Sequence, residues 1–529
     1  MYILGGIDDQ VLALVWSRLN SGGIALVSSY SVYRELFSFL INPITSNEPI
    51  TWFFVSTLSR LLGIGFFNYY NIFVLCLNFI VAFLILRRSR FCFPLAMIFT
   101  FSGYLWSHLG IHISLIHTWL VLLGYYLFWK YSDRSIKHAF LLGLFLWFSA
   151  AVSNYIGFVN ILLFFTYNIG YLLALVLVKW DLKKSKIIIR NVFVTSLTAA
   201  SIFLLTYLPF VIANYNRTDV GVSNPKDLTR PVEDFVTFSA RPWYFFTPSY
   251  KNPVYSRFAS NLVDKFSTTE YFLLDDYFHG EHAQLFFGYS FMLISLISIL
   301  LTYRKGGTEE RFWTVLSVIN ALIILFLMLP PFFTVSGIKF FTPGYLLYKV
   351  FPMFRVTSRL VIALQVIMIF FIAKFSWLSK QQTLSKKINW AIYFVLWLAL
   401  LETYIPIKII KEPDIHPIYM EIASDTDIES IIAVYPYNKT KEALYELPVY
   451  NRKLINPPSY VTGIFDSSIF TNNLHTFEGR LEARNLGVDY IVVFPFGDSG
   501  ESCESFGESS TIVELIRKRT DACIYKILK

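Results

Sequence analysis

Long apolar segments alternate with short polar turns over most of the chain. A membrane-spanning helix needs about 20 mostly apolar residues. The pattern predicts ten spans, at 69–86, 91–109, 113–129, 138–153, 156–178, 191–213, 285–303, 312–333, 356–374 and 389–406. We therefore expect an α-helical polytopic membrane protein, with a transmembrane bundle over 69–406.

Basic residues cluster after every second apolar segment. The five clusters lie at 87–90, 130–137, 179–190, 304–311 and 374–387. Lys and Arg accumulate in cytoplasmic loops, so one orientation satisfies all five. It places residues 1–68, the long loop 214–284 and the tail 407–529 on the outer face, which we take to be that of the plasma membrane.

The two outer ends of the chain differ in pattern. Residues 1–68 contain QVLALVWSRLN and PITWFFVSTLSRLLG, which have helical periodicity but carry Arg18 and Arg60. They are short, so we expect two juxtamembrane helices lying at the interface. The alternative, a span over 50–66, would invert the orientation of residues 1–48.

The tail 407–529 predicts a small extracytoplasmic α/β domain. IESIIAVYPY and DYIVVFPF are strand-like runs, and CIYKILK alternates between apolar and polar residues. FEGRLEARNLG and STIVELIRKR have the pattern of amphipathic helices.

The composition agrees with a membrane protein. The chain is 55% hydrophobic and 15% charged, whereas soluble proteins carry about 25% charged residues. The net charge of +9 is explained by the cytoplasmic clusters. No basic stripe interleaves with aromatic residues outside those loops, so nucleic acid is not an expected partner.

The four cysteines fall into two pairs. Cys76 and Cys92 lie in apolar segments and are expected to be packing residues. Cys503 and Cys523 would form a disulfide in an extracytoplasmic tail and would be free thiols in a cytoplasmic one. No Cys or His cluster has the spacing of a structural zinc site.

Acidic residues stand out in the first outer segment. Asp8 and Asp9 precede an apolar run and could cap a helix, act as a base or hold a metal. Glu48 precedes a Pro that begins the second helix. It is either a loop acid or a second carboxylate in the same outer cavity.

Histidines mark the turn between the second and third spans. His108 and His112 share a helical face only if the helix continues through Gly110. They are candidates for a metal pair or for lining a substrate cavity; the alternative is interfacial histidines bonded to the backbone.

The long outer loop mixes Arg, Pro and aromatic residues in RPVEDFVTFSARPWYFFTPSYKNP, residues 230–253. Arg241 and Tyr244 could bind or stack against a sugar or a lipid, or belong to an ordinary packed loop. Downstream, DDYFHGEHAQLFFGY carries Asp275, Asp276, His279, Glu281 and His282, which meet no known metal-ligand spacing.

Arg355 and Arg359 stand four residues apart at the outer start of a span. If the segment is helical, both guanidinium groups lie on one face. Arg binds phosphate in a bidentate manner, so the pair suits a lipid phosphate. The alternative is an anchor pair for ordinary lipid headgroups.

These motifs, in this order, resemble the GT-C superfamily of membrane glycosyltransferases, and more closely its YfhO-like bacterial and archaeal group. They are IDDQVLALVW, SNEPI, SGYLWSHLGIHISLIHTWL, EHAQLFFGYSFML, FPMFRVTSRLVIAL and GVDYIVVF. The similarity covers nearly the whole chain. Relatives usually have a span before the acidic motif, which here opens the sequence. The start is therefore expected to be miscalled, the sequence to be truncated, or the protein to lack that span.

The resemblance implies transfer of a sugar from a polyprenyl-phosphate donor to a lipid, glycan or protein acceptor at the outer face. Asp8 or Asp9 would be the base. Arg355, Arg359 and, more weakly, Arg241 would stabilise the leaving phosphate. A divalent metal is left open, since members of the superfamily differ on this point.

Two other functions remain open at this stage. A transporter or flippase of lipid-linked saccharides would carry inverted repeats with broken helices, and the sequence shows neither. A non-catalytic scaffold would scatter Asp8, Glu48, Arg355 and Arg359 in space, whereas an enzyme would gather them at one outer cavity.

Overall fold

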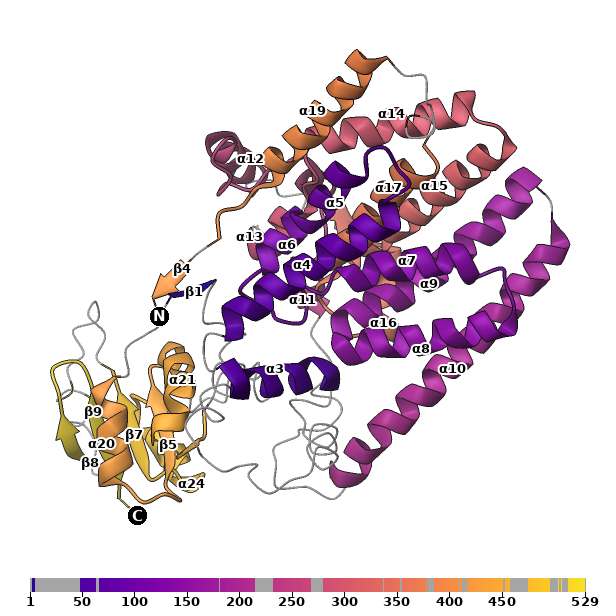
Figure 1. The fold of residues 1–529 in the computed structure, drawn as a ribbon. Helices are drawn as coiled ribbons and strands as arrows, with labels where there is room; N and C mark the ends of the chain where they lie inside the picture. The colour runs from indigo at the N-terminus through magenta and orange to yellow at the C-terminus, as the bar shows by residue number, and fades with distance from the viewer. Residues whose placement is uncertain are drawn as a thin grey trace.

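The computed structural model shows a helical bundle joined to a small sheet region near the C-terminus (Figure 1). It describes residues 2–4, 48–62, 66–179, 181–214, 232–267, 279–335, 337–352, 354–376, 378, 385–407, 409–411, 416–450, 452–456, 474–494, 503, 506 and 512–528. Asp8 and Asp9 lie outside these residues, as does the first expected juxtamembrane helix.

The main helices of the bundle correspond to apolar segments of the sequence. They are α3 (Pro49–Leu62), α4 (Phe66–Leu86), α5 (Cys92–Thr100), α7 (Trp119–Tyr131), α8 (Ile136–Val152), α9 (Asn154–Ala174, continued by a π-helical turn, Leu175–Lys179), α10 (Leu182–Asn214), α14 (Tyr289–Lys305), α15 (Thr308–Met328), α17 (Val361–Lys374) and α19 (Lys386–Thr403).

Short elements connect these helices. They are α6 (Gly103–His108), α11 (Val232–Thr237), η4 (Pro242–Phe246), α12 (Ser256–Ser267), α13 (His279–His282), η5 (Ala283–Leu285), α16 (Pro343–Val350) and η6 (Thr357–Leu360), with a hairpin of β2 (Phe332–Val335) and β3 (Ile338–Phe341).

Six helices in the described part of the chain are long and apolar enough to cross a membrane: Asn68–Leu86, Asn154–Lys179, Lys183–Leu208, Gly280–Lys305, Thr308–Met328 and Thr357–Lys374. They match six of the ten expected spans, which confirms a polytopic helical membrane protein. The other four segments form shorter or more charged helices. The segment 91–109 divides into α5 and α6, because Ser102 caps a new helix by accepting the Leu105 N–H.

Burial separates a central helix from lipid-facing ones. Every residue of α17 from Val361 to Ala373 except Met368 is buried, and α17 contacts α5, α7, α9 and α15. Large apolar side chains on α4, α10 and α19 remain exposed, among them Phe73, Phe193 and Phe394. Such apolar faces suit contact with the hydrocarbon of a bilayer. A helix can lie there because it satisfies its own backbone hydrogen bonds.

The two ends of the bundle are built differently. In Figure 1 the turns joining α4 to α5 and α14 to α15 lie toward the upper right, together with the start of α10. These are turns that carry basic clusters. The strand β1 (Tyr2–Leu4), its partner β4 (Ile409–Lys411) and helix α3 lie toward the opposite end.

The C-terminal sheet has the strand order β6-β5-β7-β9-β8. Its strands are β5 (Ile431–Tyr435), β6 (Lys453–Leu454), β7 (Tyr490–Val493), β8 (Val513–Lys518) and β9 (Cys523–Ile527), accompanied by α20 (Pro417–Asp425), η7 (Tyr437–Lys439), α21 (Thr440–Tyr450) and α24 (Phe477–Asn485). Strands β6, β5 and β7 are parallel, and β9 pairs antiparallel with β7 and β8.

Successive side chains of the strands point to opposite faces of the sheet and so contribute to two hydrophobic cores. Ala433, Ile491 and Tyr525 face one core with Ala483 of α24, while Val434 and Ile524 face the other core with α20 and α21. The expected helix over 510–519 is wrong. Residues 513–518 form β8, because pairing with β9 satisfies the backbone of a strand whose side chains are mostly exposed.

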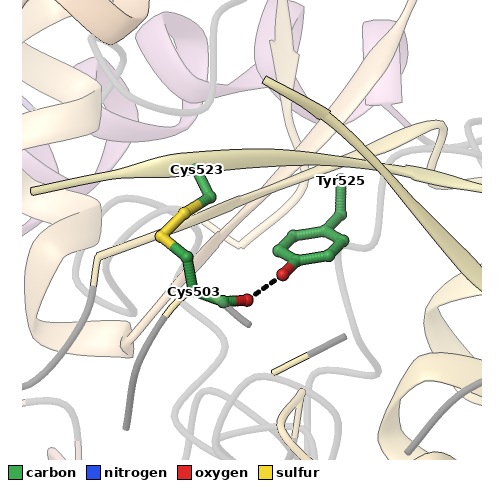
Figure 2. Close-up of a disulfide and its surroundings, with 3 residues drawn as sticks. All are labelled: Cys503, Cys523 and Tyr525. Atoms are coloured by element: carbon green, nitrogen blue, oxygen red, sulfur yellow. Dashed lines mark hydrogen bonds between the residues drawn. A yellow bond between two sulfur atoms is a disulfide. The ribbon is translucent and has the colours of Figure 1, made fainter. Parts of the chain in front are cut away.

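Cys503 and Cys523 form a disulfide in this region, with their Cα atoms 6.1 Å apart. Figure 2 shows the pair together with Tyr525, whose hydroxyl donates to the Cys503 carbonyl oxygen. Cys76 is exposed and Cys92 is half-buried, and both are free.

Candidate functional site

Helix α6 and the turn after it bring two histidines together. His108 ends α6 and is buried, and its Nδ1 lies 2.8 Å from the Tyr104 carbonyl oxygen. Gly110 adopts a φ of 74°, a left-handed conformation typical of the residue that ends a helix. The helix therefore does not continue to His112. The two rings still meet, with centroids 5.4 Å apart, because the chain turns back at Gly110.

A buried carboxylate lies beside these histidines. Glu281, on the short helix α13, is 5% exposed. Its Oε2 lies 3.7 Å from His108 Nε2 and accepts from Gln284 Nε2 at 2.9 Å. The potential ligand atoms of His108, His112 and Glu281 all lie within 4.8 Å of one another.

Arg359 completes this group. Its Nε lies 3.1 Å and 3.0 Å from the two carboxylate oxygens of Glu281, and its Nη2 also donates to Oε1. The guanidinium carbon lies 4.7 Å from the centre of the Tyr155 ring. A buried ion pair with this many hydrogen bonds fixes the position of both side chains.

Arg355 has a different partner. Its Nη1 donates to Asp234 Oδ2 at 2.6 Å, and its guanidinium carbon lies 5.0 Å from the centre of the Phe238 ring. Both side chains of this ion pair are partly exposed. Arg355 precedes the turn η6 that contains Arg359. The expectation that both guanidinium groups share one helical face is therefore wrong, because the backbone at Arg355 is not helical.

The start of α9 joins the two arginines to Glu48. The hydroxyl of Tyr155 donates to the Val356 carbonyl oxygen at 2.8 Å and accepts the Val356 N–H at 2.9 Å. One residue earlier, the Asn154 N–H donates to Glu48 Oε1 at 3.1 Å. Glu48 thus occupies the N-terminal end of α9, where exposed amides favour an anion.

Burial raises the pKa of Glu48 to about 7. Hydrogen bonds from Ser114, Ser153 and the Asn154 amide act in the opposite direction, as does the nearby charge of His112. His112 therefore faces Glu48 as well as the pair formed by His108 and Glu281.

Arg241 and Tyr244 lie beside this group. Arg241 is buried, and it donates to the carbonyl oxygens of Ser239 and Val236 at 3.1 Å and 2.7 Å. The ring of Tyr244 stacks on His282, the neighbour of Glu281, with centroids 4.6 Å apart. The bonds of Arg241 to its own loop explain its place in the structure without a ligand.

The structure thus brings together Glu48, His108, His112, Arg355 and Arg359 from separate parts of the sequence. It adds Glu281, Asp234 and Tyr155, which the residue patterns did not select. The sequence did place Glu281 in a run of acids and histidines, but no local spacing distinguished it. Its partner Arg359 is 78 residues away.

No family model matches this chain, and no curated protein matches it in sequence. Among solved structures, it is similar to the cryo-EM structure of the arabinofuranosyltransferase AftD from mycobacteria, with a TM-score of 0.43, 11% identity, and coverage of 100% of this chain and 40% of that one. A mutant of the same enzyme gives a TM-score of 0.45 and 12% identity, with 98% and 41% covered. The chain spans about two fifths of the length of these structures.

Proposed function

We propose that this chain is a GT-C-type membrane glycosyltransferase that moves a sugar from a polyprenyl-phosphate donor to an acceptor at the outer face of the plasma membrane. The observation that carries the proposal is the meeting of Glu48, His112, Arg355 and Arg359 around the start of α9. A non-catalytic scaffold gives no reason for these groups to converge.

The two arginines suit the phosphate of the donor in different ways. Arg355 is partly exposed and donates through Nη1 to Asp234. A guanidinium group has five N–H donors, so within the described residues others are available to a lipid phosphate. Arg359 is held rigidly by Glu281. Fixed positive charge of this kind stabilises a leaving phosphate without reorganisation during the reaction.

Asp8 or Asp9 is the proposed base, by resemblance to the acidic motif of the superfamily. The base takes the proton from an acceptor hydroxyl, whose oxygen then attacks the anomeric carbon as the bond to the donor phosphate breaks. The resemblance implies inversion at that carbon. The acceptor is a lipid, a glycan or a protein.

The proposed orientation rests on the basic clusters, and the disulfide adds a separate argument for it. Five basic clusters mark one side of the bundle. The disulfide between Cys503 and Cys523 suits an oxidising compartment. On this basis the cluster around α9 and the C-terminal region face outward.

The test is sugar transfer from a labelled polyprenyl-phosphate donor in membranes that contain Asp8→Asn or Asp9→Asn. We expect both variants to fold and one of them to lose about 10²- to 10⁴-fold in rate, the usual contribution of a general base. Full activity in both variants would contradict the assignment of the base. Movement of the intact lipid-linked sugar across the membrane without transfer would instead favour the transporter function.

A further inference from the structure

We infer that His108, His112 and Glu281 form a binding site for a divalent transition-metal cation of the zinc type. Two imidazole nitrogens and one carboxylate are a common ligand set of open zinc sites, which keep a fourth position for water or substrate. The three ligand atoms lie within 4.8 Å of one another. Ligand atoms about 2.1 Å from a tetrahedral metal lie closer together than this, so binding requires a small contraction of the group.

The orientation of His108 points to a ligand. Its Nδ1 lies 2.8 Å from the Tyr104 carbonyl oxygen, which as a pure acceptor places the ring proton on Nδ1. Nε2 then carries a lone pair directed toward Glu281. This nitrogen is buried and has no hydrogen-bond partner within the described residues. Metal-bound histidines are held in this way, with the second ring nitrogen bonded to a carbonyl or a carboxylate.

Glu281 is supported in the same way. Its carboxylate accepts hydrogen bonds from Arg359 and Gln284, as ligating carboxylates usually do. Arg359 donates to both oxygens and Gln284 to Oε2, the oxygen nearest His108. A cation between Oε2 and Nε2 would remove the repulsion between a lone pair and a buried carboxylate, and the arginine would remain as an outer-shell partner.

His112 supplies the open side of the site. It is half-buried, unlike the other two ligands, and it lies near both the His108 ring and Glu48. The fourth position would then face Glu48 and the start of α9. Imidazole ligands favour zinc and its neighbours over Mg²⁺ or Ca²⁺, which prefer oxygen ligands.

A bound cation would add positive charge next to Arg359, where the proposed function places the donor phosphate. A catalytic role for the metal therefore rests on the proposed function, but binding itself does not. Metal binding and sugar transfer can be measured separately on the same preparation. Absence of metal binding would therefore leave the proposed function untouched, and absence of sugar transfer would leave the metal site untouched.

The test is metal binding to the full chain in detergent, after chelation and removal of the chelator. We expect one Zn²⁺ per chain by equilibrium dialysis, and visible absorption from a low-coordinate site when Co²⁺ replaces it. His112→Gln should weaken the affinity by at least about 100-fold, since loss of an outer-shell partner alone costs about 10- to 100-fold. His108→Gln should do the same.

His138→Gln is the matched control, because His138 lies in the first turn of α8 and bonds to Ser135. An unfolding measurement on each variant checks that the fold survives, and His112 is the milder site because it is half-buried. Absence of stoichiometric zinc in the wild type, or equal affinities in His112→Gln and His138→Gln, would overturn the inference.

Discussion

The two arginines at the site differ in burial and in the number of bonds to their acids. Arg359 is held by Glu281 through both carboxylate oxygens, and both side chains are nearly buried. Arg355 donates to one oxygen of Asp234, and that ion pair is partly exposed. Removing one partner of a buried pair leaves a charge without compensation, whereas exposed pairs contribute little.

Arg359→Ala should therefore lower the free energy of unfolding by about 3–5 kcal/mol, and Arg355→Ala by about 1 kcal/mol or less. Denaturant or thermal unfolding in detergent measures both. Arg359→Lys retains the charge but loses the bidentate geometry, so it should fold and use the donor poorly. Equal stability losses for the two alanine variants would contradict the difference in burial.

Glu48 gives the site a dependence on pH. Its folded pKa of about 7 exceeds its ordinary value of 4.5 because of burial. Between these values the folded state binds more protons than the unfolded state. Stability therefore falls as the pH rises through this window and becomes level above about pH 7.

Glu48→Gln mimics the protonated side chain, so the stability of this variant should not fall as the pH rises through this window. The measurement is the unfolding midpoint at about pH 5 and about pH 8, on either side of the raised pKa. Glu429→Gln, at an exposed position in the C-terminal region, is the control. If the wild type and Glu48→Gln show the same slope, Glu48 does not titrate in this range.

At the scale of elements, the crossing of α8 and α9 positions the site. A Cβ atom at Gly157 would lie 2.3 Å from Ala150 Cα and 2.4 Å from Ala150 Cβ. The close approach of the two helices therefore requires glycine at this position. Asn154 and Tyr155, which contact Glu48 and Val356, lie less than one turn away on the same helix.

Gly157→Ala should separate the two helices and cost about 1–3 kcal/mol of stability, as overpacking does. It should also weaken donor use by displacing Tyr155. Gly170→Ala on the same helix is the control, because its Cβ would meet Leu316 O at an ordinary 3.5 Å. Stability and sugar transfer are measured for Gly157→Ala and Gly170→Ala. Similar behaviour of the two would contradict the role of the crossing.

Two elements differ from the sequence-based expectation for reasons of context. The segment 91–109 has the apolarity of one span, but the cap at Ser102 ends it and begins α6, which carries His108. The segment 510–519 has helical periodicity, but β8 forms because β9 offers a backbone partner. Periodicity describes side chains alone and does not include such partners.

At the scale of the whole molecule, the C-terminal region carries a disulfide over a sequence separation of 20 residues. Replacing Cys503 and Cys523 by Ser should cost about 3 kcal/mol, from the unfolded-chain entropy that a loop of this length removes. Cys76→Ser, at an exposed free thiol, is the control.

Alkylation followed by mass spectrometry tests the same pair in protein from the native membrane. When the membranes are dissolved in denaturing detergent without reductant, Cys76 and Cys92 should be modified and the other two should not, because only a thiolate reacts and Cys76 lies in a membrane-spanning helix of the native protein. Modification of Cys503 and Cys523 in unreduced, intact protein would show that they are free thiols and would weaken the proposed outward placement of the region.

The sequence by itself determined that the chain is a helical membrane protein with a small mixed region at its C-terminal end. The length and apolarity of a segment are local properties that can be measured in a window of about 20 residues. Residue type also selected Glu48, His108, His112, Arg355 and Arg359, because ionisable groups next to apolar spans are costly and mark functional sites.

Only the tertiary structure decided how these groups pair. Arg359 meets Glu281 over a separation of 78 residues, and Arg355 meets Asp234 over 121. No spacing rule reaches that far, because these contacts depend on how η6 packs on α13 and how the segment before η6 lies against α11. The tertiary structure likewise brought the two histidines together across Gly110 and placed Glu281 beside them.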